Sequence, residues 1–152
     1  MISVILSALV IAFSLALFLY WFRYSCILIL RTRTTADFSS SLASGSDLTF
    51  DQIQRELESG STEVDLETFR RCLEHDYELI SSLLSRAPAI TEQFSQLEQM
   101  MLQADYKVMQ AWDTASRRLF RQPSRRAIAE MSAIVAFFAN VAGEAGVLAS
   151  EA

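Results

Sequence analysis

The residues best suited to chemistry in this chain are Cys72 and His75, which lie within one helical turn of each other. At this spacing a thiol and an imidazole share one helix face and could both bind one metal ion. Further ligands would have to come from carboxylates such as Glu98, Asp105 or Asp113. The chain has one His, however, and Cys72 falls on an apolar stripe, where a single Cys usually packs as a small hydrophobic residue. We therefore expect no metal site and no cofactor.

Other signs of catalysis are weak. The chain contains no glycine-rich phosphate-binding motif, no HExxH, no CxxC and no GxSxG. Acidic residues are frequent at 63–67 and 74–78, but their arrangement is typical of a solvated helix surface and indicates no pocket that would perturb a pKa. The sequence therefore predicts a protein that is not an enzyme.

The N-terminal segment is strongly apolar. Hydrophobic residues make up 51% of the 152 residues, and no charged side chain occurs between Met1 and Phe22. At about 1.5 Å per residue, residues 2–22 form a helix of roughly 30 Å, which matches the hydrocarbon core of a bilayer. No basic residue precedes this segment and bulky aromatic residues end it, which argues against a cleaved signal peptide. We predict a transmembrane anchor with a basic stop over residues 1–33.

The boundary of this anchor gives its expected orientation. Its arginines all follow the apolar segment, so the positive-inside rule places the N-terminus outside and the rest of the chain in the cytoplasm, as in a single-pass protein of the inner or plasma membrane. Cys26, near the same boundary, is expected to be a small apolar residue rather than an acylation site. The predicted membrane-interface residues are Tyr20, Trp21, Arg23, Tyr24, Arg31 and Arg33.

A row of small residues within the anchor is a candidate helix-packing site. Small side chains at four-residue spacing let a second transmembrane helix approach closely, although Ala is also simply common in such helices. The row consists of Ala8, Ala12 and Ala16.

The rest of the chain is expected to be helical. Residues 34–48 are rich in Ser and Thr and predict a flexible linker. Beyond it, apolar residues recur three and four apart, and no strand pattern of useful length occurs. The predicted fold class is all-α, with a single transmembrane helix followed by a small antiparallel bundle over residues 49–145 and a tail over 146–152.

The bundle is expected to contain one short and three long helices. Thr49 with Gln52 resembles a capping box at the start of the short helix, and Gly60 is its expected stop. Ser124 is the expected cap of the last helix. The four predicted helices cover residues 49–58, about 61–65 to 86, about 88–91 to 121, and about 124 to 142.

The last two helices have unusual apolar patterns. The final helix is apolar on nearly every face over residues 127–142, so it packs in the bundle, binds a partner or enters the membrane. Its uncharged stretch is short for a membrane span, which favours packing in the bundle or against another subunit. The preceding helix carries a seam whose steps mostly alternate between four and three residues, the coiled-coil period. The seam residues are Ile90, Phe94, Leu97, Met101, Ala104, Val108, Ala111, Ala115 and Leu119.

Charge is unevenly distributed along the bundle. Residues 47–113 carry fourteen acidic and five basic residues, whereas residues 114–126 carry five arginines and no acidic residue. An up-down-up bundle places this basic turn at its membrane-proximal end, where it is a candidate site for anionic lipid. Complementing a helix dipole and pairing with the acidic surface remain as alternatives. The acidic surroundings argue against nucleic acid. The candidate residues are Arg117, Arg118, Arg121, Arg125 and Arg126.

Two hypotheses of function follow from the sequence. The first is a non-catalytic accessory or scaffolding subunit that uses helix–helix contacts, with a membrane-protein partner or a second copy of itself. The second is a membrane-surface regulator that binds anionic lipid through residues 117–126. Both place the protein in the lipid bilayer.

Overall fold

The protein is all-α, as the sequence predicts. The computed structural model describes residues 1–32, 48–59, 65–86 and 96–151, and its elements are all helices. The described residues do not include most of the predicted linker. They also do not include Arg33, Gly60 or the first two seam residues, Ile90 and Phe94. The helices are α1 (Ile2–Thr32), α3 (Phe50–Glu58), α4 (Leu66–Arg86), α5 (Gln96–Phe120) and α6 (Arg125–Glu151).

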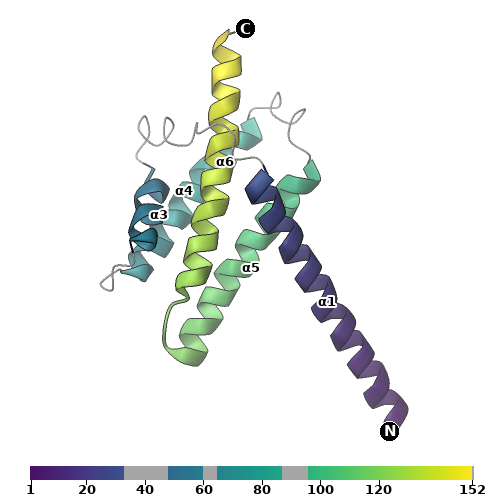
Figure 1. The fold of residues 1–152 in the computed structure, drawn as a ribbon. Coiled ribbons are helices and arrows are strands. Elements are labelled where there is room, and N and C mark those ends of the chain that lie inside the picture. Colours follow the sequence, from purple (N-terminus) through teal and green to yellow (C-terminus); the bar gives the residue numbers. More distant parts are fainter. Residues whose placement is uncertain (33–47, 60–64, 87–95, 152) are drawn as a thin grey trace.

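Helix α6 lies at the centre of the bundle. Its apolar surface can be buried on most sides, and α3, α4 and α5 all pack against it (Figure 1). The window Arg125–Glu144 is also long and apolar enough to cross a membrane, but 50% of it is buried inside the protein. The structure therefore places residues 127–142 in the core. Its buried apolar residues are Ala127, Ile128, Met131, Ile134, Val135, Phe137, Phe138 and Ala139.

Helix α6 is longer than the sequence pattern indicated. It continues through Gly143 and Gly146 to Glu151, where we expected a helix end near residue 142 and a separate tail. A Gly within a helix costs about 1 kcal/mol relative to Ala but does not by itself end the helix. No Pro occurs within α6 to interrupt it.

Helix α3 is capped by a side chain from another helix. Thr49 makes no side-chain capping bond, so the predicted capping box with Gln52 is wrong. Instead, the buried carboxylate of Asp76 on α4 accepts hydrogen bonds from the backbone N–H groups of Thr49 (2.8 Å) and Phe50 (2.9 Å) and from the Thr49 hydroxyl (3.2 Å). A carboxylate here satisfies free N–H groups and complements the helix dipole. Asp76 therefore fixes α3 against α4.

Helices α4 and α6 begin at local caps. Asp65 accepts hydrogen bonds from two backbone N–H groups of the first turn of α4. The Ser124 hydroxyl accepts one from the Ala127 N–H (3.3 Å), which confirms the predicted cap of α6. The N–H of Ser124 in turn donates to the buried Asp113 carboxylate of α5 (2.9 Å). Asp113 thereby holds the turn between α5 and α6 closed.

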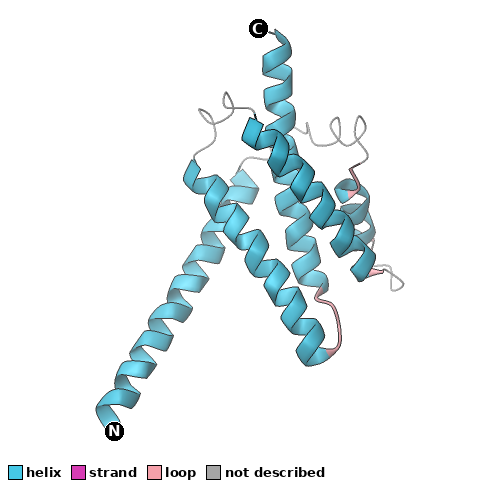
Figure 2. Cartoon of the chain, turned by 180° about the vertical axis from the view of Figure 1, so that it is seen from behind, coloured by secondary structure: helices cyan, strands magenta, loops and turns pink. Residues whose placement is uncertain are grey.

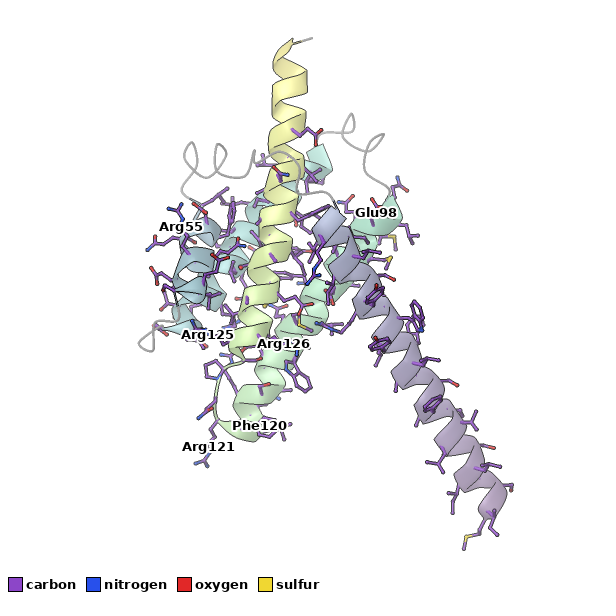
Figure 3. The ribbon with its side chains drawn as sticks, viewed as in Figure 1. Arg55, Glu98, Phe120, Arg121, Arg125 and Arg126 are labelled. Carbon is purple, nitrogen blue, oxygen red and sulfur yellow. The ribbon has the colours of Figure 1, made fainter. Side chains whose placement is uncertain are left out.

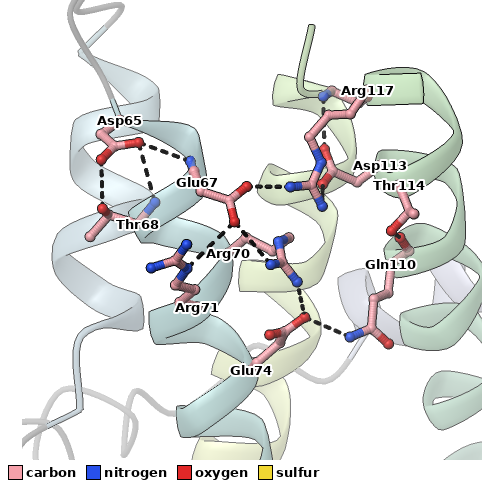
Figure 4. A network of polar contacts seen from close by, with 11 residues as sticks. Asp65, Glu67, Thr68, Arg70, Arg71, Glu74, Gln110, Asp113, Thr114 and Arg117 are labelled. Carbon is pink, nitrogen blue, oxygen red and sulfur yellow. Dashed lines mark hydrogen bonds and ion pairs between the residues drawn. The ribbon is translucent and has the colours of Figure 1, made fainter. Parts of the chain in front are cut away.

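A polar network joins α4 to α5 (Figure 4). Glu67 on α4 pairs with Arg70 of the same helix (3.0 Å) and with Arg117 on α5. Glu74 pairs with Arg70 and accepts a hydrogen bond from the Gln110 amide on α5 (2.7 Å). These contacts fix the register of two helices that both pack on α6.

Helix α1 has two parts with different surroundings. Residues 1–21 are exposed on all sides and project away from the bundle, as both views show (Figures 1 and 2). From Phe22 to Leu30 the helix packs against α5 and α6, and Cys26 is fully buried there, as expected of a small apolar residue. The segment Ile2–Arg31 is long and apolar enough to span a membrane. None of its most apolar stretch is buried inside the protein.

The regular seam of α5 is not the face that packs on α6. The buried face of α5 instead consists of residues that flank the seam, and much of the seam itself is exposed, including Leu97, Val108 and Leu119. Part of the seam faces α1, in the region where α1 runs away from α5. The buried residues of α5 are Leu102, Asp105, Tyr106, Met109, Asp113 and Ser116.

Candidate functional site

A cluster of three charged side chains joins α1 to the bundle. Arg23 donates hydrogen bonds to both carboxylate oxygens of Glu130 on α6 (2.6 Å each) and to the Oδ1 of Asp105 on α5 (3.3 Å). It also lies 3.2 Å from the sulfur of Met109. Arg23 is 26% exposed and Asp105 is 0% exposed. The arginine that we expected at the lipid headgroups thus binds two acidic residues of the bundle.

The surroundings of Asp105 disfavour its ionised form. Burial raises its pKa to about 6, and the Glu130 carboxylate adds to the rise, while Arg23 acts in the opposite direction. Its Oδ2 accepts no hydrogen bond from the described residues. Ionisation of Asp105 in the folded protein is therefore unfavourable.

The five arginines of the basic turn fall into two groups. Arg117 pairs with Glu67 and with Asp113 (3.1 Å), and Arg125 donates to the Leu57 backbone carbonyl of α3 (2.8 Å). The other three are exposed and make no ion pair with any described residue. They are Arg118, Arg121 and Arg126.

Two large apolar residues lie among the free arginines. Leu119 and Phe120, at the end of α5, are 76% and 70% exposed. The next residue, Arg121, has a left-handed backbone (φ 54°) that ends α5 and turns the chain toward α6. We call residues 117–126 the α5–α6 tip. The tip lies at the end of the bundle toward which the exposed part of α1 projects, opposite the C-terminus of α6 (Figures 1 and 3).

An apolar groove separates α1 from α5. It has a volume of about 760 Å³, and we call it the α1–α5 groove. Phe18 and Phe22 of α1 contribute to its lining, as do Val108 and Trp112 of α5, and Trp112 is 57% exposed. Arg126 of α6 also borders it. This groove and the α5–α6 tip lie next to each other in the fold.

The Cys72–His75 turn does not form part of a ligand cluster. Within the described ranges, no group of three or more His, Cys, Asp or Glu side chains is arranged to hold a metal ion. Two of the carboxylates considered as ligands have other partners, because Asp105 binds Arg23 and Asp113 binds Arg117. His75 is exposed and Cys72 is partly buried.

The remaining predicted site residues lie along α1. Ala8, Ala12 and Ala16 are exposed, and no described part of the bundle covers them. Tyr20, Trp21 and Tyr24 are also exposed where α1 begins to pack on the bundle, and Arg31 is exposed beyond the packed part of the helix. Sequence reasoning missed Glu130 as a partner of Arg23, and it missed the α1–α5 groove. The available signal was a single acidic residue at the start of an otherwise apolar helix.

No protein-family model matches this chain, and no curated protein or solved structure does so either. The arrangement of α1, the groove and the tip is therefore the basis for its function.

Proposed function

We propose that this chain is a non-catalytic, single-pass membrane protein whose helical bundle rests on the anionic inner surface of the membrane through the α5–α6 tip. Helix α1 is the anchor, its N-terminus lies outside, and the bundle is cytoplasmic. This is the membrane-surface hypothesis, now restricted to the arginines that the bundle leaves unpaired.

One observation carries the proposal: exposed apolar and free basic side chains occur together at the tip. Leu119 and Phe120 would enter the headgroup boundary, while Arg118, Arg121 and Arg126 would meet lipid phosphates. Such a pairing is typical of proteins that lie on anionic bilayers. Each arginine near an anionic leaflet contributes about 1 kcal/mol, and this attraction is screened within a Debye length at physiological salt.

The position of the tip supports the same conclusion. Arg23 ties α1 to both α5 and α6, so the direction of the anchor is coupled to the bundle. With this coupling, a membrane crossed by α1 lies on the side of the bundle where the tip is found (Figure 3). The mostly acidic surface of α3 and α4 would then be held away from the leaflet.

A tryptophan at the tip tests the proposal. The chain has two Trp residues, so Phe120→Trp in a Trp21→Phe/Trp112→Phe background gives a single reporter. In vesicles of phosphatidylcholine and phosphatidylglycerol with brominated chains, we expect its fluorescence to be quenched. In phosphatidylcholine alone, quenching should be weaker, and it should respond little to salt.

A matched pair of variants separates the tip from general charge effects. Arg118→Gln/Arg121→Gln removes two free arginines of the tip and should reduce quenching in the anionic vesicles. Arg55→Gln/Arg71→Gln removes two exposed arginines of α3 and α4, and should leave it unchanged. Equal effects of the two pairs, or no quenching in anionic vesicles, would contradict the proposal.

The orientation requires its own measurement. A C-terminal fusion to a reporter that is active only in the cytoplasm should be active, and one that is active only outside should be inactive. The opposite pattern would place the bundle outside and remove the basis for an anionic inner leaflet as its contact.

A second candidate function is an accessory subunit that binds another transmembrane helix. The observation in its favour is that the row of Ala8, Ala12 and Ala16 is uncovered on α1. The partner would be a membrane protein or a second copy of this chain. Ala12→Leu should then abolish a complex that survives mild detergent extraction. Ser14→Leu, on the opposite side of α1, is the control, and equal behaviour of both variants would count against this function.

A further inference from the structure

The α1–α5 groove combines apolar walls with an unpaired cation. Phe18, Leu19 and Phe22 of α1 and Val108 and Trp112 of α5 supply apolar surface. Arg126, from the first turn of α6, borders the groove and makes no ion pair with any described residue. The two other charged groups at the groove, Arg23 and Glu130, pair with each other, and Arg23 also pairs with the buried Asp105. Arg126 is therefore the charged group of the groove lining that has no ion pair among the described residues.

We propose that the α1–α5 groove binds a single anionic phospholipid, with an acyl chain along its apolar walls and the phosphate at Arg126. The inference rests on the proposed function, because it needs α1 to be the membrane anchor. It goes further by assigning one lipid to one site, whereas the tip meets the leaflet as a surface.

The surroundings of the groove favour lipid as its occupant. One wall belongs to α1 at residues 18–22, at the end of the apolar segment, where the surrounding medium would be acyl chains and headgroups. Leaving Trp112 exposed in water would cost free energy, whereas Trp is favoured at the boundary between headgroups and acyl chains. A lipid chain in the groove would cover its ring.

The size of the groove argues against a helix of a partner protein. A volume of 760 Å³ lies within the range of pockets for small ligands. A helix with its side chains is roughly 10 Å across, so this volume would hold only about two turns of it. A transmembrane helix has roughly 20 residues and would leave most of its surface outside the groove.

Charge complementarity selects the headgroup. A guanidinium binds phosphate with two parallel hydrogen bonds, and its attraction grows when the lipid has no balancing cation. Phosphatidylglycerol offers this net charge, whereas the choline of phosphatidylcholine offsets it. One arginine near such a headgroup corresponds to about fivefold enrichment of the anionic lipid.

Quenching of Trp112 tests the assignment in the full-length protein. With Trp21→Phe, Trp112 is the single reporter, and it lies in the groove. The vesicles contain phosphatidylcholine and a minor fraction of phosphatidylglycerol, with bromine on the chains of one lipid at a time. At equal amounts of brominated lipid, we expect brominated phosphatidylglycerol to quench Trp112 about fivefold more effectively.

Two variants show whether the groove itself is responsible. Arg126→Gln should bring the two lipids to nearly equal quenching, whereas Arg125→Gln, whose arginine binds the Leu57 carbonyl, should keep the difference. Ala111→Phe, on the exposed lining of α5, should fill the groove and reduce quenching of Trp112 by both lipids.

The tip reporter distinguishes failure of this inference from failure of the proposed function. Equal quenching of Trp112 by both lipids in the Trp21→Phe protein, or no quenching, overturns the lipid assignment. If the tryptophan placed at Phe120 is still quenched in anionic vesicles, the tip contact stands and the groove is empty or holds a protein helix. If that reporter is also unquenched, the proposed function fails as well.

Discussion

Replacing Asp105 with Asn tests the electrostatics of the joint between α1 and the bundle. Asp105 is fully buried, receives one 3.3 Å contact from Arg23, and leaves its Oδ2 without a hydrogen bond from the described residues. Folding raises its pKa from 3.8 to about 6, because burial and Glu130 both disfavour the carboxylate. Asn has nearly the same shape and no charge. It can still accept from Arg23, and its amide can donate to Glu130.

The size and sign of the effect follow from proton linkage. Because the pKa is raised on folding, the stability contributed by Asp105 is fully present below pH 3.8 and is lost as the pH rises through about 6. A difference of about two pKa units corresponds to about 3 kcal/mol. We therefore expect Asp105→Asn to stabilise the protein by about 1–3 kcal/mol at pH 7.5, since some of this gain is lost with the Arg23 ion pair. At pH 4 the gain should be small.

Unfolding of the full-length protein in mild detergent, followed by circular dichroism at pH 4 and 7.5, measures this difference. Asp113→Asn is the matched control: it changes an equally buried Asp of α5, which pairs with Arg117 and accepts from the Ser124 N–H. That variant should destabilise by about 1–3 kcal/mol. If Asp105→Asn destabilises at pH 7.5, or if its gain is the same at both pH values, the desolvation argument is wrong.

Four further substitutions test the packing. Asp76→Ala should cost about 2–3 kcal/mol, because it leaves buried N–H groups at the start of α3 unsatisfied, and faster hydrogen exchange of α3 would report it. Arg121→Gly should raise stability by up to about 1 kcal/mol in thermal unfolding, because Gly adopts φ 54° without strain; a loss would contradict the left-handed cap. Ile134→Ala should destabilise by about 2–5 kcal/mol in the same assay, while Leu119→Ala should change little, because Ile134 is buried in α6 and Leu119 is exposed. Similar effects of these two truncations would contradict the assignment of the core.

The periodic part of the fold was predictable from the sequence. Apolar residues at helical spacing, a Ser at 124 and the absence of alternating strand patterns were sufficient to predict the helices and the cap of α6. The cap of α3 was not, because the acceptor is Asp76, far along the chain. A local sequence pattern contains no information on which distant carboxylate reaches a helix start.

The seam of α5 shows where periodicity misleads. Its regular spacing indicated a packing face from Leu97 to Leu119. Helix α6 instead packs on the neighbouring face, which includes Tyr106 and the polar Asp105 and Asp113. These two aspartates can lie on the buried face because each has a polar partner outside α5. Asp105 pairs with Arg23, and Asp113 accepts a hydrogen bond from the Ser124 N–H. Such pairs depend on tertiary contacts.

The candidate site was only partly predictable. The distribution of charge along the sequence identifies the five arginines of residues 117–126. Whether each arginine can bind lipid depends on its partners in α3, α4 and α5. Arg117 and Arg125 bind groups of the bundle, and the other three arginines lie near the exposed Leu119 and Phe120. Separating free from paired arginines required the packing of the bundle.

Hydrogen exchange of the full-length protein in nanodiscs tests the central claim most directly. We expect amides of the tip at 117–126 to exchange more slowly in discs that contain phosphatidylglycerol than in discs of phosphatidylcholine alone. High salt should reduce the difference, and amides of α3 should not change. Identical exchange of the tip in both discs at low salt would show that the bundle does not rest on an anionic membrane surface.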